Sequence, residues 1–130
     1  MKAIQITLAG RECYLAFTGA AMFELREQFG NTTELLQAIQ TDTKEALTTA
    51  AKVAAILAEQ GELARRHLGY DHGPIVTAEA IMATTPPSGI EALKLAIPAA
   101  ITLGYGREVG PEIGEVDLGL AELNAQKKTS

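Results

Sequence analysis

The chain of 130 residues has no tryptophan, only one cysteine, and few aromatic residues, three Phe and three Tyr. Its interior must therefore be built mainly from aliphatic side chains, many of them alanine, and this composition favours helices that pack closely on small residues. Because Cys13 has no second cysteine to pair with, an intramolecular disulfide is excluded, and a buried thiol is the favoured interpretation of this residue. The length suffices for one core without metals or disulfides.

Positive charge is also scarce. Lys and Arg number 11 against 16 Asp and Glu, which gives a formal net charge of −5, and the densest basic clusters are pairs. Since nucleic-acid phosphates attract clustered Lys and Arg, we expect no nucleic-acid partner. Long apolar runs are missing too: residues 1–10 lack the apolar region of a signal peptide, and Lys52 interrupts the alanine-rich segment 46–58. We expect a soluble, cytoplasmic protein that does not contact a membrane.

The start of the chain predicts a β-hairpin. Apolar and polar residues alternate over residues 4–8, Gly10 supplies a turn, and residues 14–17 form a second β-like run. An isolated hairpin is barely stable in water, so its apolar face must pack on another element. The segment between Thr18 and Gly30, residues typical of a helix start and a helix end, is the expected partner.

Four further helices are predicted from capping residues and from apolar side chains at helical spacing. Gly61 either ends or bends the second of them, and Pro98 either kinks or splits the last. These patterns predict a mainly α protein with a small N-terminal β-hairpin, an α+β helical bundle formed by residues 1–104. The expected first capping residues of the four helices are Asn31, Asp42, Thr77 and Ser88.

Residues 105–130 differ in composition from the rest of the chain. The stretch 105–126 contains four glycines, a proline and five acidic residues against one arginine. Because such a segment loses much conformational entropy on ordering, we predict a mobile, acidic, glycine-rich tail. Its spaced apolar residues are expected to order on a partner, and a plain disordered terminus is the alternative. The candidate partner-binding residues are Val116, Leu118, Leu120 and Leu123.

The sequence predicts neither a catalytic nor a metal site. His67 and His72 flank Asp71, but their spacing matches none of the usual zinc-ligand pairs, and solvent-facing histidines are the favoured interpretation. Cys13 has no neighbouring motif that would activate a nucleophile. The glycines of residues 104–106 follow a helix rather than a strand and lack the Gly-Lys-Ser or Gly-Lys-Thr of a phosphate loop. We therefore predict a protein that is not an enzyme and has no cofactor.

The order of elements and both ends of the chain resemble the small tail assembly chaperones of long-tailed, siphovirus-type bacteriophages. The resemblance is carried by ITLAGRECYLAFTGAAMFELREQFGNTTELLQAI at the start, alanine-rich helices in the middle, and EVDLGLAELNAQKKT at the end. It implies a non-enzymatic protein that binds and solubilises the aggregation-prone tape measure protein and promotes assembly of the tail tube. The implied partners are the tape measure protein, the tail tube protein and, in a homo-oligomer, further copies of the chain.

The resemblance also implies that the protein acts in the cytoplasm of the bacterial host and is absent from the mature virion. Members of this family are often made in two lengths by a ribosomal slip, and adenine-rich codons at Lys127-Lys128 would provide the slip site. Alternatively, these lysines only solubilise a chain end. Two other functions remain open, a structural connector or tail completion protein of the phage particle, and a small enzyme or regulator.

Overall fold

The computed structural model describes residues 1–119. Within this range it contains five α-helices and a three-stranded antiparallel sheet with strand order β2-β1-β3, so the predicted mainly α fold with an N-terminal hairpin is confirmed. Leu120, Leu123 and the Lys127-Lys128 pair lie outside the described residues. The elements are β1 Lys2–Leu8, β2 Arg11–Leu15, α1 Gly19–Phe29, α2 Thr32–Ile39, α3 Lys44–His67, α4 Ala78–Thr84, α5 Pro87–Gly104, the 3-10 helix η1 Pro111–Ile113 and β3 Glu115–Asp117.

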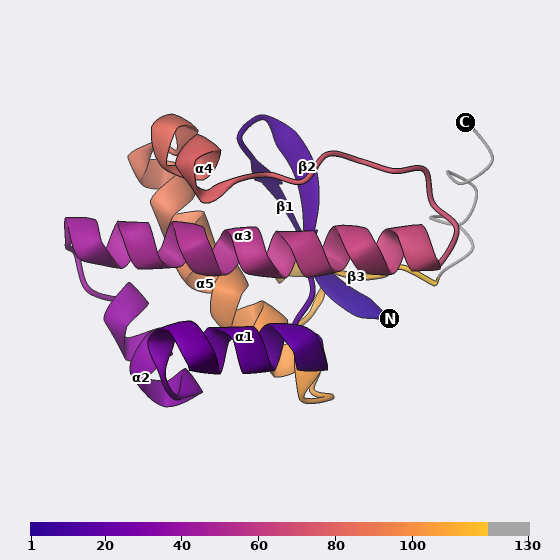
Figure 1. The fold of residues 1–130 in the computed structure, drawn as a ribbon, viewed down its shortest axis with the longest axis horizontal. Coiled ribbons are helices and arrows are strands. Elements are labelled where there is room, and N and C mark those ends of the chain that lie inside the picture. The colour runs from indigo at the N-terminus through magenta and orange to yellow at the C-terminus, as the bar shows by residue number, and fades with distance from the viewer. Residues whose placement is uncertain (120–130) are drawn as a thin grey trace.

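The longest helix, α3, spans the molecule, and the other elements are arranged around it (Figure 1). In this view α1 and α2 lie along one side of α3, and α4 and the turn of the hairpin lie on the other. Helix α5 crosses behind α3 and packs on both α3 and β1. The hydrophobic core therefore lies where α3, α5 and the hairpin meet, and Ile4, Leu15, Leu57, Leu93 and Ile97 are its fully buried centre.

Three helix starts are confirmed by their capping hydrogen bonds. The side chain of Thr18 accepts from the amide of Ala21 at 3.1 Å, and that of Asn31 accepts from the amide of Glu34 at 2.8 Å. Thr77 caps α4 in the same way. Each bond satisfies one of the amide groups that a helix start leaves without an intrahelical partner.

Two predicted caps are wrong. Thr43, not Asp42, caps α3 and accepts from the amide of Ala46 at 3.0 Å. The carboxylate of Asp42 pairs instead with a lysine of α5, which the local sequence does not reveal. Helix α5 starts at Pro87 without a side-chain cap, so Ser88 lies inside it. Proline suits a first helical position because its missing N–H would have no partner there.

Neither Gly61 nor Pro98 interrupts its helix. Helix α3 continues through Gly61 to His67, and α5 continues through Pro98 to Gly104. At Gly61 the reason for glycine is the close approach of β2, because a Cβ atom at this position would collide with the carbonyl group of Tyr14. The backbones of β2 and α3 are thereby in direct contact.

The boundary predicted at residue 105 lies too early in the chain, because residues 105–119 belong to the domain. Strand β3 pairs with β1 through Val116 opposite Ala3, and Leu118 is 1% exposed. The hydroxyl of Tyr70 donates to the carbonyl oxygen of Leu118 at 2.7 Å. Pairing is available here because β2 occupies only one edge of β1, and Gly114, at φ 98°, brings the chain against that free edge.

Candidate partner-binding surface

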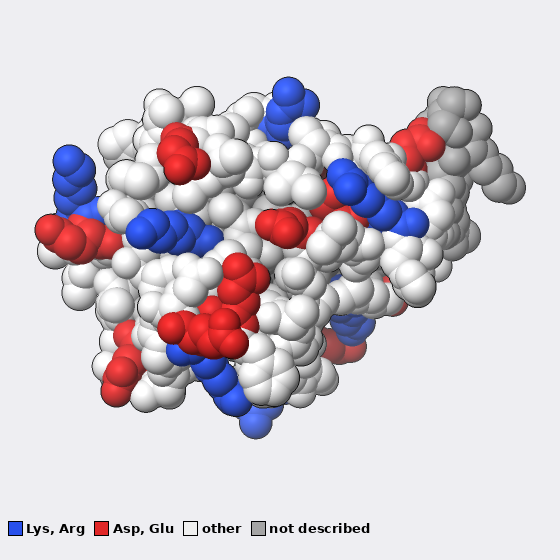
Figure 2. Space-filling view, viewed as in Figure 1, with Lys and Arg blue, Asp and Glu red and all other residues white. Residues whose placement is uncertain are grey.

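Charges of both signs are mixed on the face shown in Figure 2, with uncharged surface between them. The largest acidic group in this view lies over α1, which carries the exposed Glu24 and Glu27. Arg26, on the same helix, is the nearest basic residue in sequence. This face is not the continuous basic surface that phosphate binding requires.

The predicted partner-binding residues divide into two groups. Val116 and Leu118 pack with Ala3, Tyr14 and Leu68 in a second, smaller hydrophobic cluster. Leu118 is fully buried there, so its side chain contributes to the chain's own core. Leu120 and Leu123 lie outside the described residues, and their role stays a prediction.

The residues considered for chemistry are not brought together. His67 and His72 are exposed, and residues 1–119 contain no group of three or more His, Cys, Asp or Glu side chains that could hold a metal ion. Cys13 is buried, and this burial raises the pKa of its thiol. A buried, protonated thiol is a poor nucleophile at neutral pH.

A buried ionic cluster fixes the loop that follows α3. The carboxylate of Glu62 is 2.6 Å from Nη1 of Arg65 and 2.8 Å from Nε of Arg66, and it accepts from the amide of Gly73 at 2.7 Å. Burial would raise the pKa of Glu62, but these hydrogen bonds outweigh it and hold the pKa below its ordinary value. The cluster is satisfied within the chain, which indicates a structural role.

Arg65 extends this cluster to two tyrosine rings. Its guanidinium carbon lies 5.5 Å from the ring centre of Tyr14 and 4.9 Å from that of Tyr70. Such distances are typical of cation–π contacts. Tyr70 also donates a hydrogen bond to the carbonyl oxygen of Leu118. Arg65 therefore links the end of α3 to the sheet through Tyr14, and to the segment after β3 through Tyr70.

On the opposite side of the molecule, Pro98 creates a link between α2 and α5. Proline has no N–H, so the carbonyl oxygen of Lys94, four residues earlier, has no helical partner. The side-chain amide of Gln40 donates to this oxygen at 3.1 Å. The amine of Lys94 in turn reaches Oδ1 of Asp42 at 2.7 Å. The end of α2 and the middle of α5 are therefore held together at the proline.

Two hollows lie beside this link. One, of about 530 Å³, is formed by Leu36, Pro98 and polar residues of α2. The other, of about 330 Å³, lies between the turn joining α2 to α3, the first turns of α3, and α5. Leu95, three residues before Pro98 and thus on the same face of α5, is 66% exposed. We define the α2/α5 surface as Leu36, Gln40, Lys94, Leu95, Pro98 and the smaller hollow.

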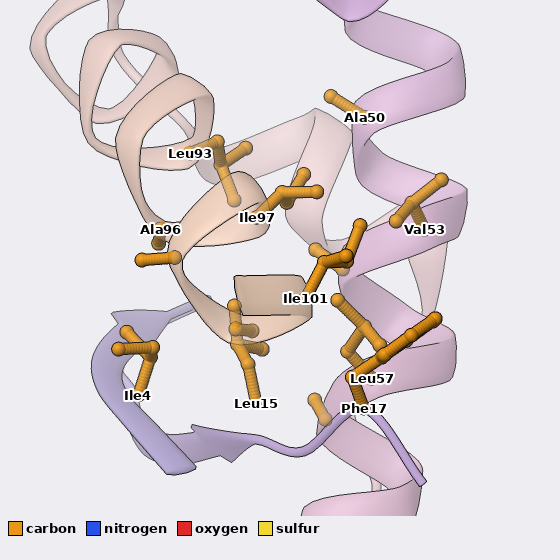
Figure 3. Close-up of a cluster of buried hydrophobic side chains, with 14 of the residues drawn as sticks. Ile4, Leu15, Phe17, Ala50, Val53, Leu57, Leu93, Ala96, Ile97 and Ile101 are labelled. Carbon is orange, nitrogen blue, oxygen red and sulfur yellow. The ribbon is translucent and has the colours of Figure 1, made fainter. Parts of the chain in front are cut away.

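The α2/α5 surface rests on a rigid support. Figure 3 shows Leu93, Ile97 and Ile101 of α5 directed toward α3 and the hairpin. These three side chains are buried. Leu95 and Pro98 belong to the other, solvent-facing side of the same helix. A helix that is buried on one side and exposes apolar residues on the other can present a preformed contact surface to a partner.

Sequence reasoning missed this surface, although one signal was present. Leu95 and Pro98 lie three residues apart in a helical pattern, and this spacing places two apolar side chains outside the stripe formed by Leu93 and Ile97. The sequence does not predict that α2 contributes to this surface, because Gln40 is 54 residues from Lys94 along the chain.

Comparisons with known proteins give no match, either to a protein-family model, to a curated protein or to a solved structure. Over residues 1–119, none of the helices combines the length and apolar character needed to cross a membrane. The proposed function therefore depends on the resemblance described above and on the geometry of the surface.

Proposed function

We propose that this protein is a phage tail assembly chaperone, which binds and solubilises the tape measure protein and promotes assembly of the tail tube. The observation that carries the proposal is the α2/α5 surface, where Leu95 is two-thirds exposed on a helix whose residues Lys94 and Pro98 each line a hollow. Extended amphipathic helices have apolar stripes that aggregate in water. A groove-like apolar surface can cover such a stripe reversibly.

The order of elements supports the proposal, because a hairpin followed by helices is the architecture that the resemblance implies. The chaperone would act in the cytoplasm without catalysis or a cofactor. Modest affinity suits this role, since the tape measure helix must be released when tube subunits enclose it. A small contact surface provides such affinity, because the cost of association offsets much of the free energy gained by burying it.

Co-expression with the tape measure protein encoded near the same gene tests the proposal. Wild-type chain is expected to keep the tape measure protein in the supernatant and to co-purify with it. Leu95→Asp should lower the co-purified amount about tenfold, an effect of 1.4 kcal/mol, because it places a charge in the apolar contact. The amount of tape measure protein per tagged chain, measured on gels, gives the result.

Phe23→Asp is the matched control. Phe23 is 60% exposed on α1 and lines neither hollow, so this variant should co-purify like the wild type. If Phe23→Asp loses binding and Leu95→Asp does not, the binding face lies on α1. Failure of the wild-type chain to solubilise or bind the tape measure protein would refute the chaperone function.

Purified virions distinguish a chaperone from a structural connector or tail completion protein. A chaperone leaves the tail when assembly ends, so mass spectrometry of particles of the encoding phage should detect none of this chain, while the tail tube protein from the same sample provides the control. Stoichiometric amounts of the chain in intact particles would favour the structural alternative.

A further inference from the structure

The smaller hollow of the α2/α5 surface is an apolar pocket with a polar rim that carries two lysines and one aspartate. Its volume of about 330 Å³ lies at the lower end of the range of ligand pockets. Thr41, Asp42, Thr43, Lys44 and Lys94 form its polar rim. The apolar lining consists of Ile39, Ala46, Leu47, Ala50 and Ile90.

The rim contains an ion pair whose two members differ greatly in exposure. The side chain of Lys94 is 11% exposed, whereas that of Asp42 is 94% exposed. The amine of Lys94 also lies 3.4 Å from the carbonyl oxygen of Gln40, which keeps it at the mouth of the pocket. An ion pair with such an exposed acid contributes little to stability. Another carboxylate can therefore replace Asp42 on Lys94 without loss of the fold.

The lining and the rim of the pocket indicate which chemical groups a bound partner would place there. The aliphatic lining favours a bulky apolar group, because filling the pocket removes apolar surface from water. The lysine at the mouth favours a carboxylate next to that group. In a helix, residues three or four apart lie on the same face, so a single turn can supply both groups.

We propose that this pocket is the anchor point for the partner, and that it binds a helical segment with a large aliphatic side chain and an Asp or Glu one turn away. The aliphatic side chain fills the pocket between Ala46, Ala50 and Ile90, and the acid displaces Asp42 from Lys94. This inference rests on the proposed function, because it assigns the tape measure helix to a particular pocket.

Three variants test the anchor by co-purification with the co-expressed tape measure protein. Ala46→Leu fills the pocket and should lower the co-purified amount about tenfold. Lys94→Met removes the cation and should lower it by a similar factor. Asp42→Asn removes the competing carboxylate and should raise it about twofold. Lys94→Met is thus expected to lower co-purification and Asp42→Asn to raise it. If the ion pair were only structural, the loss of either partner would lower co-purification.

Ala20→Leu provides the control for Ala46→Leu, since Ala20 is an exposed alanine of α1. It should leave co-purification unchanged. Thermal unfolding of each variant checks the fold, and Ala46→Leu should unfold no earlier than the wild type because its added methyl groups enter an existing hollow.

The outcomes distinguish the pocket from the function. If the wild type binds the tape measure protein and the folded Ala46→Leu and Lys94→Met variants bind equally well, the pocket is not the anchor, although the chaperone function stands. If the wild type does not bind, both proposals fail. Native mass spectrometry of the purified chain tests for a different occupant of the pocket. A fatty acid that is retained by the wild type and absent from Ala46→Leu would overturn the assignment to a helical partner.

Discussion

Replacing Gly61 by alanine is expected to destabilise the protein by about 3 kcal/mol. In an uncrowded helix the same change would stabilise by roughly 1 kcal/mol, because alanine has the higher helix propensity. Here the added Cβ atom would collide with the carbonyl group of Tyr14. The amide of Ala16 also donates to the carbonyl of Leu57 at 3.1 Å, so neither backbone can move away without loss of a contact between β2 and α3.

Urea unfolding monitored by circular dichroism measures this loss. Gly19→Ala is the control, because a Cβ atom at this first residue of α1 would meet no heavy atom within 4 Å beyond those of adjacent residues and the helix's own backbone. Its unfolding free energy should stay within about 0.5 kcal/mol of the wild type. A Gly61→Ala variant as stable as the wild type would contradict the direct contact between the two backbones.

The elements that sequence reasoning predicted well are those that depend on neighbouring residues. Thr18, Asn31 and Thr77 cap helices through amide groups only three residues away, so a short window contains the whole interaction. Apolar alternation over residues 4–8 likewise predicts a strand, because adjacent side chains point to opposite faces. Local chemistry was sufficient in these cases.

The wrong caps show how distant contacts override local preference. Asp42 and Thr43 are both good capping residues, and intrinsic preference favours aspartate over threonine. The ion pair between Asp42 and Lys94, 52 residues apart, leaves the cap to Thr43. At Ser88 the reason is local instead, because the preceding Pro87 already suits the first position of α5.

The segment after α5 was the largest error, since composition was its only local signal. Its glycines and acids predicted independence from the domain, but Val116 pairs with Ala3 and Leu118 is held by Tyr70. These partners lie far away in sequence, and a strand of three residues has too few side chains to show alternation. The candidate site shows the same limit, because the surface beside Pro98 requires Gln40 from α2.

Replacing Glu62 by alanine is expected to cost about 3–5 kcal/mol in the free energy of unfolding, the usual effect of breaking a buried ion pair. Glu62 is 7% exposed and binds Arg65, Arg66 and the amide of Gly73, so its removal leaves two half-buried cations and an amide without their acceptor. Glu59→Ala, an exposed acid in the same helix, should change stability by less than about 0.5 kcal/mol. Equal stability of both variants would show that the cluster does not support the fold.

The pH dependence of the unfolding free energy shows whether the charge of Glu62 is the cause of this stabilisation. Because its pKa is lower in the folded protein than in the unfolded chain, its contribution is present above the unfolded pKa of about 4.3 and is lost as pH falls through the folded value. Glu62→Gln keeps the shape of the side chain but cannot ionise. The difference in unfolding free energy between the wild type and Glu62→Gln should therefore be largest near neutral pH and decrease below about pH 4. Urea unfolding of both proteins across this range measures the difference, and a gap that stays constant down to pH 3 would mean that shape, rather than charge, holds the loop after α3 in place.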